Sequence, residues 1–159
     1  FLSRENTKKI FRNLFKDKNF KKWNFNQSNL YLDFLAGNQT YLCKPWSSPT
    51  YNIFGWQKPC YHLSEGYYKT FDELINKTDW EQYGTGNYDK CSDCMTHCGY
   101  ESTAIEALYK NPWEGLKKKI FGIRTTGPMV EDIKLSASRP AEDLYDKILE
   151  QKMYELDLM

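Results

Sequence analysis

The stretch KCSDCMTHCGYES, from Lys90 to Ser102, holds three of the five cysteines of this 159-residue chain. These are Cys91, Cys94 and Cys98, and the last of them directly precedes a predicted helix. Two cysteines with two residues between them can bind one metal centre from a single tight turn. Clustered cysteines can instead form disulfides or act as reactive thiols. The stretch therefore predicts a turn that brings thiols to the start of a helix.

The other two cysteines, Cys43 and Cys60, lie upstream in a segment rich in aromatic residues and proline. Residues 41–44 and 51–56 predict a hairpin, and its two arms would add one thiolate each. Gly55 suits a bulge or a close backbone approach to a bulky cluster. Four thiolates suit either zinc or a [4Fe–4S] cluster, and spacing alone does not separate the two. Disulfides and separately buried cysteines remain alternatives, and His62 and His97 could substitute as zinc ligands.

The charge of the chain is balanced, with 22 Lys and Arg against 21 Asp and Glu. Such a chain has no overall field that would attract nucleic acid or an anionic membrane. We interpret the local basic runs FKDKNFKKW and GLKKKIFGIR as solvated helix faces and ends. The chain begins at Phe1 within a helical pattern and without a secretory signal. We therefore expect a fragment of a longer protein from a reducing compartment, where clustered cysteines more often bind metal.

Apolar spacing and capping residues predict the order of the elements. Ser3 would cap a helix whose apolar face holds Ile10, Phe11, Leu14 and Phe15. The run LYLDFLAG, residues 30–37, predicts a buried strand, and a helix that leads into a strand is typical of a parallel sheet or barrel. Asp33, near the end of this strand, is a candidate catalytic residue, with a structural role equally open. Further helices are predicted over residues 70–79, 99–111, 112–121 and 140–156.

The strings LYLDFLAG, YNIFGWQKPCY, EGYYKTFDEL, TDWEQYGTGN and KCSDCMTHCGYE resemble the C-terminal portion of the hopanoid-biosynthesis radical SAM family. The order of cysteines also resembles the auxiliary-cluster (twitch) domain of other radical SAM enzymes. The resemblance implies an α/β fold, α+β in its C-terminal part. Residues 1–37 would end a partial (β/α) barrel, residues 38–112 would form a cysteine-rich auxiliary domain, and residues 113–159 a helical extension. The implied ligands of an auxiliary [4Fe–4S] cluster are Cys43, Cys60, Cys91 and Cys94, with Cys98 as the alternative fourth ligand.

The resemblance also implies an activity of the adenosylhopane synthase type. A reduced [4Fe–4S] cluster in a missing N-terminal barrel would cleave S-adenosylmethionine, because this chain has no Cys-x3-Cys-x2-Cys loop. The resulting 5′-deoxyadenosyl radical would add to a hopene (diploptene). The implied partners are that barrel and an apolar polycyclic triterpene, and no nucleic acid. A bacterial cytoplasmic location follows, which leaves open a peripheral association with the inner membrane surface. The alternative is a zinc-stabilised structural or binding module without catalytic activity.

Overall fold

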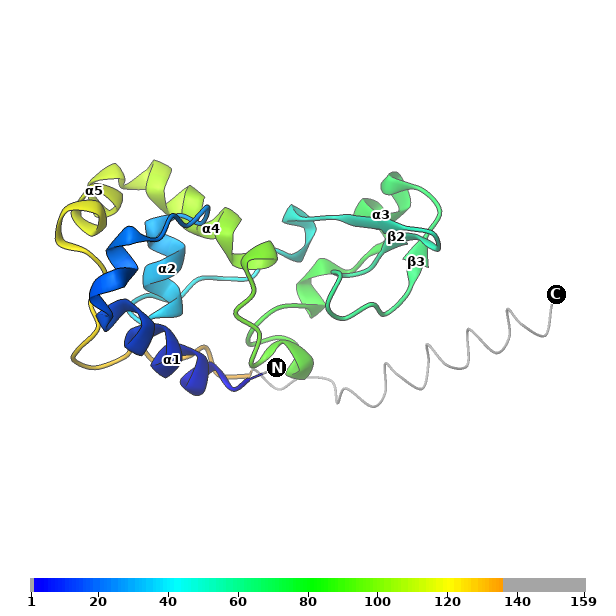
Figure 1. Cartoon of the computed structure of the whole chain (residues 1–159). Helices are drawn as coiled ribbons and strands as arrows, with labels where there is room; N and C mark the ends of the chain where they lie inside the picture. The colour runs from blue at the N-terminus through cyan, green and yellow to red at the C-terminus, as the bar shows by residue number, and fades with distance from the viewer. Residues whose placement is uncertain (1, 136–159) are drawn as a thin grey trace, which may run out of the picture. The chain divides into compact units, whose positions relative to one another are not determined.

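A computed structural model describes residues 2–135 of the chain, and these residues fall into two compact units (Figure 1). Unit 1 comprises residues 2–44 and 93–133, and unit 2 comprises residues 45–92 with 134–135. The units do not follow the expected divisions after residues 37 and 112. The helix predicted over residues 140–156 lies outside the described residues.

Unit 1 is helical. Its elements are α1 (Arg4–Lys16), the 3-10 turn η1 (Lys18–Lys22), α2 (Asn29–Leu35), α4 (His97–Lys110) and α5 (Pro112–Phe121). The prediction for α1 is confirmed, since the side chain of Ser3 accepts a hydrogen bond from the backbone nitrogen of Asn6. The prediction for α5 is confirmed as well, with Pro112 at its start. Helix α4 begins at His97, so Cys98 lies inside the helix and not before it.

The strand predicted over residues 30–37 was wrong, because this segment forms helix α2. Ser28 caps α2 by accepting a hydrogen bond from the backbone nitrogen of Tyr31, and every residue from Leu30 to Leu35 is buried. A short apolar run that is buried on all sides has no periodic signal that distinguishes a helix from a strand. Helix α1 therefore leads into another helix, and the partial (β/α) barrel is not confirmed.

The core of unit 1 lies where α2 packs against α4. Phe34 and Tyr100 are fully buried, and their rings stack with centroids 4.7 Å apart. The guanidinium of Arg4, from α1, lies 5.4 Å from the ring centroid of Phe34 and 5.6 Å from that of Tyr100. A buried guanidinium above two aromatic faces is stabilised by their negative surfaces. The side chain of Arg4 therefore joins α1 to the packed rings of α2 and α4.

The described part of the segment after α5 is bonded to α1 and to Gly37, which follows α2. The backbone nitrogen of Val130 donates to the carbonyl of Gly37 at 2.9 Å. Asp132 accepts from Arg4 at 2.9 Å and from Lys8 at 2.7 Å. Burial alone would raise the pKa of Asp132, but the hydrogen bonds and charges of Lys8 and Arg4 outweigh it and lower the pKa. This loop is therefore tied to unit 1 by ion pairs.

Unit 2 contains a small antiparallel sheet and one helix. Its strands are β1 (Thr50–Asn52), β2 (Gly55–Gln57) and β3 (Tyr67–Tyr68) in the order β1-β2-β3, and its helix is α3 (Phe71–Lys77). Short 3-10 turns are η2 (Pro45–Ser47), η3 (Trp80–Gln82) and η4 (Asp89–Cys91). The capping box of α3 is confirmed, because the side chain and backbone of Thr70 and Glu73 exchange two hydrogen bonds of 3.2 Å. The described fold is α+β.

The hairpin was predicted over the wrong segments of the chain. Residues 41–44 form no strand, and the two arms are β1 and β2, with Asn52 paired to Gly55. The side chain of Asn52 accepts from the backbone nitrogen of Phe54 at 2.9 Å, which closes the tight turn. A Cβ atom on Gly55 would lie 2.5 Å from the carbonyl oxygen of Tyr68, and its φ is +121°. Gly55 therefore allows β2 to approach β3.

Candidate functional site

Three of the predicted ligands lie in unit 1, at the N-terminal end of α4. Cys94 comes three residues before the first helical residue, His97, and Cys98 is the second residue of the helix. Cys43 reaches the same end from a distant part of the sequence, because a Cβ atom on Gly99 would lie 2.3 Å from its sulfur. Only glycine at position 99 leaves room for that sulfur. The structure thus brings Cys43, Cys94 and Cys98 to one end of one helix.

Hydrogen bonds along α4 hold the segment that carries Cys43. The backbone nitrogen of Lys44 donates to the carbonyl of Gly99 at 2.7 Å. The hydroxyl of Thr103 donates to the carbonyl of Leu42 at 2.8 Å, and the ammonium of Lys44 pairs with Glu106. The backbone polar groups that a strand would have used are therefore bonded to a helix. This explains why residues 41–44 form no strand.

The turn that carries Cys94 is held by side chains from α1 and α2. Arg4 donates to the carbonyl of Cys94 at 2.6 Å, and the hydroxyl of Tyr31 donates to the carbonyl of Met95 at 2.8 Å. The sulfur of Cys94 lies 3.5 Å from the hydroxyl of Thr96. The guanidinium and the positive end of the α4 dipole both favour negative charge at this turn.

The other two cysteines lie in unit 2. Cys60 is half-buried, and the side-chain amide of Gln57 donates to its carbonyl at 3.2 Å. Cys91 is buried at the end of η4, where its backbone nitrogen donates to the carbonyl of Tyr88 at 2.9 Å. The hydroxyl of Tyr88 donates to the buried carboxylate of Glu65. Burial, followed by the hydrogen bond and charge of Glu65, raises the pKa of Tyr88 well above its usual value.

The predicted four-cysteine set is thus divided between the units. Cys43 and Cys94 belong to unit 1, and Cys60 and Cys91 belong to unit 2. Within residues 2–135, no group of three or more His, Cys, Asp or Glu side chains is arranged to hold a metal ion. The complete set stays a prediction, as does its choice between iron–sulfur and zinc.

Asp33 has structural partners on both carboxylate oxygens and is fully buried. One oxygen accepts from the amide of Asn38 at 2.8 Å, and the other accepts from Gln39 at 2.7 Å and from Lys118 at 2.9 Å. The hydroxyl of Tyr41 donates to Gln39 at 2.7 Å and extends this network. Burial and then the charge of Asp33 raise the pKa of Tyr41 to about 12. These contacts favour a structural role for Asp33.

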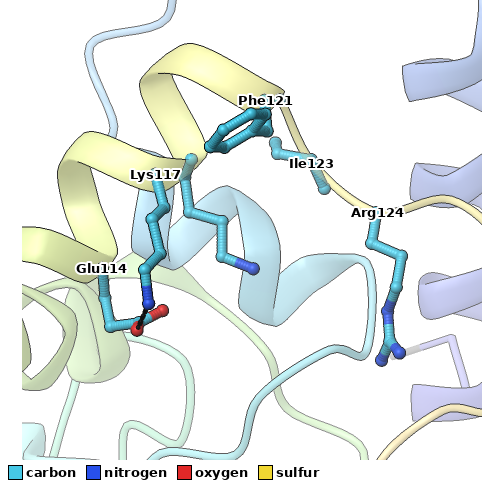
Figure 2. Close-up of a pocket in the computed structure, with 7 residues that line it drawn as sticks. Glu114, Lys117, Phe121, Ile123 and Arg124 are labelled. Carbon is cyan, nitrogen blue, oxygen red and sulfur yellow. Dashed lines mark hydrogen bonds and ion pairs between the residues drawn. The ribbon is translucent and has the colours of Figure 1, made fainter.

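An open pocket of about 270 Å³ lies between the second half of α5 and the chain that follows it. Figure 2 shows Lys117 directed toward Glu114, with which it forms an ion pair of 2.8 Å, while Phe121 and Ile123 supply the apolar part of the lining. Lys118, Gly122 and Arg124 complete it. The pocket lies within the run GLKKKIFGIR, which we had interpreted only as a solvated surface.

Comparison with known proteins gives one informative result. No curated protein and no solved structure shows significant similarity to the chain. One family matches residues 1–118, which include α1, α2, all five cysteines and the first part of α5. The chain therefore belongs to the family described as "Domain of unknown function (DUF3463)".

Proposed function

We propose that this chain is the C-terminal part of a radical SAM enzyme of hopanoid biosynthesis, with an auxiliary [4Fe–4S] cluster held by its cysteines. The proposal rests on the resemblance of the tryptophan- and cysteine-bearing strings to that family. One structural observation supports it most directly. Gly99 leaves space for the sulfur of Cys43, although the two residues lie 56 positions apart in the sequence (99 − 43).

The proposed ligands of the auxiliary cluster are Cys43, Cys60, Cys91 and Cys94, and Cys98 is the alternative fourth ligand. When bound, such a cluster supplies one-electron chemistry or a Lewis-acidic iron. Contacts within the chain would position two of these cysteines, because Arg4 and Tyr31 hold the Cys94 turn and Gly99 leaves room for the sulfur of Cys43.

The proposed reaction joins an adenosyl group to a triterpene alkene. S-adenosylmethionine takes up one electron, and the bond between its sulfonium and its 5′ carbon breaks to give methionine and the 5′-deoxyadenosyl radical. The 5′ carbon then forms a bond with the terminal alkene carbon of a hopene, which leaves a carbon radical on the triterpene. A second electron from a low-potential one-electron donor and one proton complete adenosylhopane. The residues that cleave S-adenosylmethionine would precede Phe1.

The auxiliary cluster can be tested on this chain alone, because it has no Cys-x3-Cys-x2-Cys loop to hold a second cluster. After anaerobic reconstitution with iron and sulfide, we expect a brown protein with roughly four irons per chain. Cys94→Ser should lose the iron and Cys98→Ser should keep it, and the opposite pattern would assign Cys98 as the fourth ligand. A colourless protein that retains one zinc would refute the cluster and support the zinc-stabilised module.

The activity requires the longer protein. Incubation with S-adenosylmethionine, a strong reductant and diploptene under anaerobic conditions should yield adenosylhopane, detected by mass spectrometry. The residues before Phe1 should include a Cys-x3-Cys-x2-Cys loop. If that loop is absent, or if S-adenosylmethionine is cleaved without any adduct of a hopene, the proposed reaction is wrong.

A further inference from the structure

Helix α5 exposes its large apolar residues. Trp113, Leu116 and Ile120 recur at a spacing that places them on one face of a helix, and they are 69%, 42% and 64% exposed. Phe121, at the end of the helix, is 84% exposed. No residue of α5 is buried. The outer face of α5, defined by these four residues, is therefore an apolar surface that contributes little to the core of unit 1.

The inner face of α5 is polar or small, which is the reverse of an ordinary surface helix. The ammonium of Lys118 is only 20% exposed and pairs with buried Asp33 at 2.9 Å. Gly115 faces Leu108 of α4, and a Cβ atom on it would lie 2.2 Å from the end of that side chain. A surface helix normally turns its apolar stripe toward the core. The described residues therefore do not account for the apolar stripe of α5.

Cations flank the outer face of α5. At 3.6 residues per turn, Lys117 and Lys119 lie on opposite sides of the stripe formed by residues 113, 116 and 120. Lys117 and Arg124 also line the neighbouring pocket (Figure 2). Glu114 is the only acidic residue of α5. A short helix with Trp and Phe on one face and lysines along its borders is typical of a helix that lies in a membrane interface.

We propose that the outer face of α5 docks on the surface of an anionic phospholipid bilayer. Trp113, Ile120 and Phe121 would enter the headgroup region, while Lys117 and Lys119 would face lipid phosphates. Charge complementarity selects this occupant, because Lys119 is exposed beside the stripe and Lys117, 59% exposed in its surface ion pair with Glu114, can exchange that partner for a lipid phosphate. The helix would lie on the bilayer and not cross it, since no helix among residues 2–135 is long and apolar enough to do so. This inference does not depend on the proposed function.

Sedimentation with lipid vesicles tests the proposal. The chain should bind phosphatidylcholine vesicles that contain phosphatidylglycerol, and bind pure phosphatidylcholine vesicles much more weakly. Ile120→Ser/Phe121→Ser should lower binding by about 10-fold or more, because two large apolar side chains no longer leave water. The matched control is Ile53→Ser/Phe54→Ser, which changes the same two residue types at the exposed turn between β1 and β2. This control should bind like the unchanged chain.

The charge contribution is tested by Lys117→Gln/Lys119→Gln. Each lysine near an anionic surface should contribute about 5-fold to binding, and added salt should weaken the effect. Circular dichroism identical to that of the unchanged chain verifies that the variants fold. The proposal is overturned by the absence of binding to anionic vesicles, by equal binding to neutral ones, or by equal losses in the two Ile–Phe variants. Self-association that Ile120→Ser/Phe121→Ser abolishes, without vesicle binding, would show instead that a second copy covers the surface.

Discussion

Replacing Asp33 with Asn should destabilise unit 1 without changing its fold. The carboxylate is fully buried and accepts from Asn38, Gln39 and Lys118 at 2.7 to 2.9 Å. Asn has nearly the same shape, but it carries no charge and one of its two polar atoms cannot accept a hydrogen bond. The variant therefore removes the ion pair to Lys118. It also places the NH2 group of the new side chain against at least one amide donor that the carboxylate accepted from.

The size of this destabilisation follows from how deeply each partner of the ion pair between Asp33 and Lys118 is buried. Removing one partner of a buried ion pair costs about 3–5 kcal/mol, because the other charge stays desolvated. Lys118 is 20% exposed, so its ammonium regains part of its hydration, and we expect the lower end, about 3 kcal/mol. Lys118→Met should cost about as much or more, since the carboxylate that it leaves is 0% exposed. The double variant Asp33→Asn/Lys118→Met should cost less than the sum of the two single variants, because neither charge is then left unpaired.

Amide hydrogen exchange measures this loss unit by unit. A loss of 3 kcal/mol lowers the protection of the slowest amides of α2 by about 100-fold. The amides of α3 in unit 2 provide an internal control and should change little. If Asp33→Asn alters the α2 amides by less than about threefold, the carboxylate does not stabilise the unit in the way that its contacts indicate. An equal change in α3 would contradict the assignment to unit 1.

Two further results are expected from other sites. Gly99→Ala should destabilise unit 1 in thermal unfolding and prevent iron binding, because the new Cβ atom would lie 2.3 Å from the sulfur of Cys43. Gly115→Ala is the control within the next helix: only the flexible end of Leu108 must move, alanine favours helix by about 1 kcal/mol, and the net loss should be small. The pKa of Tyr41 is raised to about 12 in the folded chain, whereas an unfolded tyrosine titrates near 10.0. The stabilisation that comes from keeping Tyr41 neutral should thus be complete below the pKa of the unfolded tyrosine and be lost as the pH rises to about 12. Ultraviolet titration of the chain and of Tyr41→Phe should reveal one late-titrating tyrosine as the difference, and identical curves would contradict the assignment.

The helix ends that were predicted correctly are those whose capping residues lie within a few positions of the backbone groups that they bind. The Ser3 cap, the box formed by Thr70 and Glu73, and Pro112 at the start of α5 all act on backbone groups one to three positions away. Such local hydrogen bonds depend little on the rest of the chain, so they can be inferred without it. The amphipathic pattern of α1 belongs to the same class of signal.

Helix α2 shows where local inference failed. Its apolar run is buried on every side, so hydrophobic periodicity disappeared and length alone suggested a strand. The available signal was Ser28, a favourable cap one residue before α2. The strand predicted over residues 41–44 was wrong for a different reason, since the backbone of this segment is bonded to α4 and not to another strand. Which partner an extended segment finds is a question of tertiary packing.

The sequence by itself determined the caps, the helix-forming faces and the presence of five thiols in a recognisable spacing. Only the tertiary structure decided that Cys43 meets Gly99, that Asp33 meets Lys118, and that the apolar stripe of α5 faces outward. The physical reason is distance along the chain. Caps join atoms a few residues apart, whereas these contacts join residues separated by more than fifty positions (99 − 43 and 118 − 33) and depend on how whole helices pack.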